Sequence, residues 1–119
     1  MHRIKKSAAR TDLILEWKKI GHDHVVCLTG GDEHVGAVAV GYYDIKSKRA
    51  SSSVITSPGH RETELALFGA RVISKAGKST SVFIAGIHLE DIIPEEIEEI
   101  VSVAERMIDE LSVIIQEVC

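Results

Sequence analysis

The 119-residue sequence has few aromatic residues, few prolines and few cysteines: it contains one Trp, two Tyr, two Phe, two Pro and two Cys. Few rings are available to stack on bases and no basic helix appears, so a nucleic-acid partner is disfavoured. Cys27 and Cys119 lack metal or redox spacing, which excludes a disulfide scaffold. No apolar stretch approaches the ~18 residues that span a bilayer, and the N-terminus lacks the apolar segment of a secretory signal. We therefore expect a cytoplasmic protein with no membrane contact.

What the sequence does contain is the balance of one compact domain covering residues 1–119, with 45% hydrophobic and 27% charged residues. The core must be aliphatic because aromatic residues are scarce. Residues 1–11 are rich in Lys and Arg, and we predict that they form a flexible basic arm.

Charge is divided unevenly along the chain. Residues 1–89 hold 13 basic and 8 acidic residues, whereas residues 90–119 hold 10 acidic residues and a single basic one, Arg106. Two parts of opposite net charge can attract each other within a monomer or across a dimer, and the basic part could bind an anion.

Apolar periodicity and turn signals predict an α+β fold with element order ββββαβα. Tight turns make the first four strands an antiparallel meander, and both helices should cover one face of the sheet. The first helix should begin at Ser57-Pro58-Gly59 and end at Gly77, and the second should begin at Pro94. The strands are expected at residues 12–20, 25–29, 35–42, 50–56 and 80–87.

The final helix is more aliphatic than a single core-facing stripe requires. Its stripe runs from Ile97 to Val118 and is typical of a helix that packs on a core. Val101, Val103 and Val113 fall beside the stripe, and this excess predicts a homodimer.

Three histidine-containing loops should converge on one edge of the predicted sheet: residues 30–34, 57–62 and 86–91. Each offers one His, at least one acid and at least one Gly. His34, His60 and His88 could hold a zinc-like divalent metal, or could share acid and base roles with Glu62. The simpler alternative is that the histidines are solvent-exposed and that Glu90 or Asp91 only caps the last helix. His22 and His24 lie in a predicted turn and are interpreted as surface residues, with metal binding as the alternative.

The predicted helix start near Gly59 adds a possible anion seat to the same edge. Free N–H groups at a helix N-terminus attract phosphate or carboxylate, and Arg61 follows closely. The alternative is an ordinary capped helix, since no Walker or dinucleotide motif is present.

Short motifs in the three loops resemble those of the prenylated-flavin-chaperone-like family, small accessory proteins associated with bacterial gallate decarboxylases. These motifs are Gly30-Gly31 through His34-Val35-Gly36, Pro58-Gly59-His60-Arg61-Glu62 and Ala85-Gly86-Ile87-His88, and the resemblance spans roughly residues 12–116. It implies a proteasome-assembly-chaperone-like α+β fold and an accessory role beside a decarboxylase large subunit. It also implies that the protein holds or delivers prenylated FMN or FMN without performing the decarboxylation. The positions carried over to such a site are Gly30, Gly31, His34, Gly59, His60, Arg61, Glu62, Gly86 and His88.

Two other functions remain open on the residues alone. A small metal-dependent enzyme would use His34, His60 and His88 as ligands and Glu62 as general base. A pure assembly chaperone would bind partner proteins through its sheet and long helix, with the histidines incidental.

Overall fold

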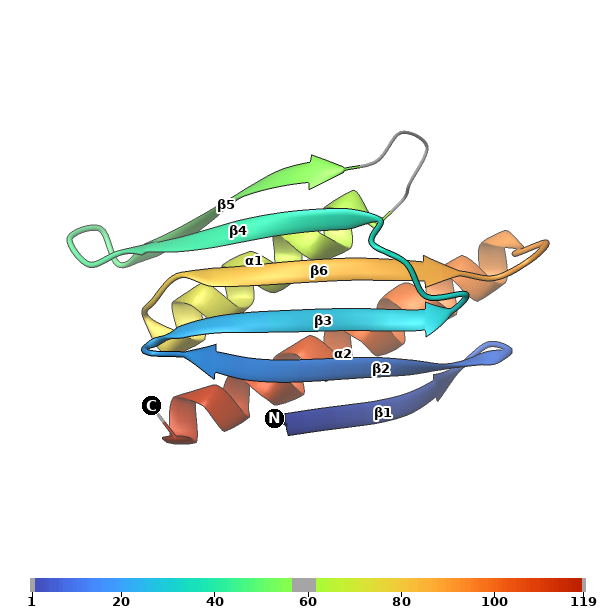
Figure 1. Cartoon of the computed structure of the whole chain (residues 1–119), viewed down its shortest axis with the longest axis horizontal. Coiled ribbons are helices and arrows are strands. Elements are labelled where there is room, and N and C mark those ends of the chain that lie inside the picture. The colour runs from blue at the N-terminus through green and yellow to red at the C-terminus, as the bar shows by residue number, and fades with distance from the viewer. Residues whose placement is uncertain (1, 57–61, 119) are drawn as a thin grey trace.

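The computed structural model describes residues 2–56 and 62–118, which form one six-stranded sheet covered by two helices (Figure 1). The class is α+β, as predicted. The elements are β1 (His2–Ala8), β2 (Thr11–Ile20), β3 (Asp23–Gly31), β4 (Ala37–Asp44), β5 (Arg49–Thr56), α1 (Thr63–Gly77), β6 (Ser81–His88) and α2 (Pro94–Val118).

The strand order is β1-β2-β3-β6-β4-β5, so the predicted four-strand meander is wrong. The strand β6 lies between β3 and β4, parallel to β3 and antiparallel to β4. The 32–36 connection therefore passes the end of β6 instead of closing a hairpin (Figure 1). Because β6 is apolar on both faces, a central position buries more of it than an edge would.

The basic N-terminus is a strand and not the predicted flexible arm. Seven residue pairs join β1 to β2 in antiparallel register. Ile4 and Ala8 are buried because their shared face of β1 turns toward the core. Just after the strand, Arg10 donates to both carboxylate oxygens of Glu96 in α2, at 2.6 and 3.1 Å.

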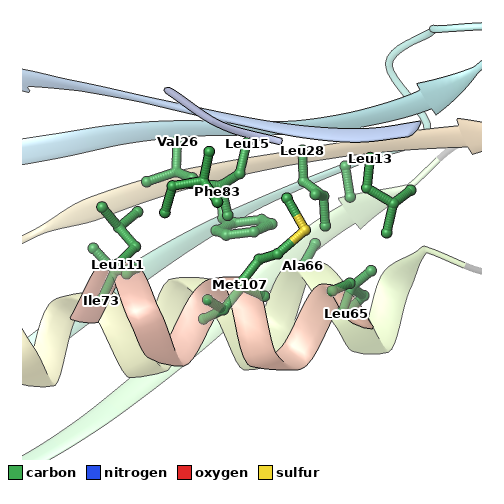
Figure 2. Packing of buried hydrophobic residues seen from close by; sticks show 14 of the residues in the cluster. Leu13, Leu15, Val26, Leu28, Leu65, Ala66, Ile73, Phe83, Met107 and Leu111 are labelled. Carbon is green, nitrogen blue, oxygen red and sulfur yellow. The ribbon is translucent and has the colours of Figure 1, made fainter. Parts of the chain in front are cut away.

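Both helices cover the same face of the sheet, as predicted. Figure 2 shows side chains from the sheet, including Leu28 and Phe83, directed at helix residues such as Met107. The helix α1 packs on β4, β5 and β6, whereas α2 packs on β1 and β2. A largely aliphatic core between these two layers is what the scarcity of aromatics required.

The N-terminus of α1 differs from the prediction, whereas its C-terminus agrees with it. The helix begins at Thr63 after Glu62 as its N-cap residue, and the predicted Ser57 and Pro58 signals lie outside the described residues. The C-terminus at Gly77 is confirmed, and the left-handed residue that follows it is Lys78.

The aliphatic stripe of α2 is largely confirmed. Its buried residues include Ile100, Met107 and Ile115, and Val103 also belongs to the core. Val101 and Val113 remain exposed. Within the described part of the chain, neither helix combines the length and apolar character required to cross a membrane.

His24 lies in the core, so its interpretation as a surface residue is wrong. Strand β3 already begins at Asp23, and the strand alternation turns the next side chain inward. Trp17 Nε1 donates to His24 Nδ1 over 3.0 Å, and the two rings pack with centroids 5.9 Å apart. Burial lowers the pKa of His24, and the charge of Lys19 lowers it further. The fold therefore favours the neutral form of this imidazole.

This buried imidazole should make stability depend on pH. The unfolded chain binds a proton at His24 below about pH 6.5, whereas the folded chain resists it. The contribution of neutral His24 to the free energy of unfolding is complete above pH 6.5 and is lost as the pH falls toward the lower pKa of the folded state. We expect the melting temperature, followed by fluorescence of Trp17, to fall between pH 6.5 and 5 in the wild type and to fall less in His24→Gln.

The control for this experiment is His22→Gln, which alters an exposed histidine two positions away. It should keep the wild-type slope. Equal slopes in the wild type and His24→Gln would contradict the prediction.

Candidate functional site

The candidate site lies at the end of the sheet where the carboxyl ends of the central strands β3 and β6 are side by side; this end is called the edge below. Gly31 and His88 are partners in the parallel register, and the Asp32 amide donates to the His88 carbonyl over 2.9 Å. The chain then passes beside β6, where the Gly36 amide donates to Ala85 O over 3.0 Å. The 30–36 and 86–90 segments are thus joined by backbone hydrogen bonds.

The side chains of His34 and Glu62 meet at this edge. His34 Nε2 lies 3.4 Å from Glu62 Oε1, and His34 Nδ1 lies 3.1 Å from the Asp32 carbonyl oxygen. Glu62 is only 8% exposed, and its Oε1 also accepts a hydrogen bond from the Ile87 amide over 3.2 Å. A buried carboxylate requires hydrogen-bond or ion-pair partners. Through these contacts Glu62 connects the start of α1 to the 30–36 segment and to the 86–90 segment.

His88 faces a different set of groups. Its Nε2 lies 3.7 Å from Glu90 Oε2, and ligand atoms of Asp32, His88 and Glu90 all lie within 4.8 Å of one another. The His34 and His88 rings are arranged edge to face with centroids 6.4 Å apart. Two of the three predicted histidines are therefore neighbours, but each has its own carboxylate partner.

The glycines at this edge are explained by contacts within the protein. A Cβ on Gly86 would collide with the backbone of His34, and a Cβ on Gly31 would collide with the His88 carbonyl. Gly31 also has a φ of +63°, which L side chains rarely adopt. Neighbouring backbone therefore fills the space beside these two glycines, while at Gly30 a Cβ would meet Leu13.

The rest of the predicted site falls outside the described residues. Gly59, His60 and Arg61 all lie there, so the three-histidine metal set and the anion seat stay predictions. The described helix α1 starts after them, at Thr63.

Sequence reasoning did not select Asp32 and Glu90 as partners of His88. Both residues lie in loops that were expected to converge, and this expectation was the sequence signal that could have paired them with His88. Neither Glu90 nor Asp91 has a recorded capping bond among the described residues; instead the Glu96 side chain accepts from the Ile93 amide over 3.2 Å.

The arrangement permits two kinds of chemistry. His34 between a carbonyl and a carboxylate can donate from both ring nitrogens when protonated, and so can hold or pass a proton. The carboxylates around His88 can hold a cation.

A family model provides the deciding comparison. The prenylated flavin chaperone LpdD-like domain matches residues 7–116, which is nearly the whole chain. The chain belongs to this family.

The structural comparison agrees with a chaperone-type fold. The LpdD-like chain is similar to a chain from a crystal structure described as a novel chaperone complex for yeast 20S proteasome assembly. The TM-score is 0.63 at 12% identity, over 96% of this chain and 97% of that one. At this identity the likeness shows the fold alone. The comparison with curated proteins found no match.

The backbone contact at Gly86 predicts a large loss of stability in Gly86→Ala. The new methyl group would push the His34 segment off β6, which we expect to cost about 3 kcal/mol of unfolding free energy. Gly21→Ala, at a turn with φ +63° and no neighbouring atom within 4 Å, should cost only about 1 kcal/mol. Urea denaturation measures both; equal losses would contradict the close packing described here.

Proposed function

We propose that this LpdD-like protein is an accessory factor that binds prenylated FMN or FMN at the edge formed by residues 30–36, Glu62 and residues 86–88 and delivers it to a decarboxylase. The observation that carries this proposal is the match of a prenylated flavin chaperone family over residues 7–116. The decarboxylase large subunit would be the client, and the chemistry of decarboxylation would stay with that enzyme.

The geometry of the edge supports flavin binding at His34 and His88. Their side chains are 28% and 55% exposed, so both can reach a ligand. Glu62 is buried and hydrogen-bonded to the Ile87 amide, so it is fixed in place beside His34. The more exposed His88 imidazole can donate to or accept from the polar edge of an isoalloxazine ring. The His34 ring is held in place because its nitrogens face Glu62 and the Asp32 carbonyl, so it offers a preorganised surface on which the flavin ring can pack.

Titration with prenylated FMN and with FMN, followed by visible absorption and flavin fluorescence, tests the proposal. We expect saturable binding by the wild type and about tenfold weaker binding by His88→Ala, because one hydrogen bond to a charged or polar ligand group is worth about 1.4 kcal/mol. His22→Ala is the matched control, since His22 is exposed at the opposite end of β3 and should leave the affinity unchanged.

The same samples then test delivery. Wild-type protein loaded with prenylated FMN should raise the yield of active enzyme from a flavin-free decarboxylase above that given by free prenylated FMN. No flavin binding by the wild type, together with no effect on decarboxylase maturation, would reject the proposed function.

The accessory protein is further proposed to be a homodimer, paired through the sheet face away from the helices. On this face Val38, Ile84 and Cys27 are register partners across β4, β6 and β3, and Val40 and Val82 form part of the next row. They are only partly buried, whereas the alternate residues face the helices.

A second copy is the occupant that this surface fits best. Six strands spaced about 4.8 Å apart, with about eight residues each at about 3.3 Å per residue, present roughly 750 Å², of which the apolar strands β3, β6 and β4 make up about half. Pairing over the whole face would therefore approach the ~800 Å² that each partner contributes to a standard interface, with the polar outer strands forming its rim. The exposed Val101 and Val113 on α2 are 12 residues apart and so lie on different sides of the helix, which makes a helix-mediated dimer less favourable.

Sedimentation velocity of two matched variants tests the dimer. The wild type should sediment as a dimer at tens of micromolar, Val40→Arg as a folded monomer, and Val101→Arg, on α2, as a dimer. A monomeric wild type would contradict the proposal, and a monomer produced only by Val101→Arg would place the interface on the helix.

A further inference from the structure

Three exposed side chains at the β3–β6 edge offer one imidazole and two carboxylates to a common point. Ligand atoms of Asp32, His88 and Glu90 lie within 4.8 Å of one another. The 3.7 Å separation of His88 Nε2 from Glu90 Oε2 is the only close ion pair recorded within this trio among the described residues.

The backbone holds two of these residues side by side. Gly31 pairs with His88 in the parallel ladder, and the Asp32 amide donates to the His88 carbonyl over 2.9 Å. The positive φ of Gly31 turns the chain at the end of β3, and its missing Cβ lets the His88 carbonyl approach. The third ligand, Glu90, follows two residues after the end of β6. The donor positions are therefore set largely by the sheet.

The local electrostatics also point to a cation. Two carboxylates this close repel each other, and among the residues that the structure describes His88 is the basic side chain grouped with both. The Arg10 guanidinium lies beside this segment but donates to the backbone carbonyl of Glu90 and to the side chain of Glu96, not to a carboxylate of the trio. A bound metal would remove the repulsion and increase the number of partners of each carboxylate.

The donor types restrict the metal. Mixed imidazole and carboxylate ligands suit Zn²⁺ and the neighbouring divalent first-row metals, whereas Ca²⁺ and Mg²⁺ prefer oxygen ligands alone. Bond lengths of about 2.0–2.2 Å require the donors to close by roughly 1 Å, which exposed side chains can do by rotation.

We propose that Asp32, His88 and Glu90 form a binding site for one divalent first-row transition metal, with its remaining coordination positions open to solvent or to an anionic oxygen ligand. This set shares only His88 with the three-histidine set considered from sequence. His34 is not a ligand here, because its ring nitrogens face Glu62 and the Asp32 carbonyl. Metal binding at this site does not depend on the proposed flavin function.

The test is titration of untagged, chelator-treated, full-length protein with Zn²⁺ by calorimetry and with Mn²⁺ by the loss of its free-ion paramagnetic resonance signal. We expect one equivalent per chain. Asp32→Asn and Glu90→Gln should each weaken binding at least tenfold, and Mn²⁺ should broaden the NMR signals of His88 but not those of His22.

The matched control is Glu33→Gln, which removes the same charge from the exposed residue next to Asp32. It should bind metal like the wild type, which separates a defined site from a diffuse acidic surface. If Asp32→Asn fails to fold, Glu90→Gln still decides the question, because the Glu90 side chain is 81% exposed. Absence of saturable binding, or equal weakening by Glu33→Gln and Glu90→Gln, would overturn the proposal.

Discussion

The parallel pairing of β3 with β6 is the constraint on which the rest of the structure depends. It places β6 in the middle of the sheet and brings the ends of both strands to one edge, with Gly31 opposite His88. The 32–36 connection must then pass the end of β6, so close that position 86 has no room for a Cβ. The histidine and carboxylate groups of the candidate site are carried by these two segments and by Glu62, which hydrogen-bonds to the second of them.

The uneven charge of the sequence is partly an internal complementarity. The basic N-terminal strand lies beside the acidic helix α2, where Arg10 binds Glu96 and Lys6 lies 3.9 Å from Glu110. The hydrogen bond from Arg10 lowers the pKa of Glu96. The Ala9 amide also donates to Glu99. Attraction within a monomer, one of the two alternatives open on the sequence, therefore operates between the two parts of the chain.

The same strand shows why local pattern misjudged the N-terminus. Residues 2–8 contain only two core-facing apolar positions, Ile4 and Ala8, which is too weak a signal to predict a strand. The partners that stabilise β1 are β2 and the acidic side of α2. The residue pattern of positions 2–8 carries no information about these partners. His24 was misjudged for a similar reason, because its burial depends on Trp17 and on the close approach of Gly77.

The sequence by itself determined the α+β class, the aliphatic core and the helix termini at Gly77 and Pro94, because periodicity and capping act over a few residues. It also identified the 30–34 and 86–91 loops as neighbours, since strand ends alternate between two edges. Only the tertiary structure decided that β6 separates β3 from β4, and that His34 pairs with Glu62 while His88 faces Asp32 and Glu90. The reason is that strand order and side-chain partners arise from burial and long-range hydrogen bonds, which no local stretch of sequence encodes.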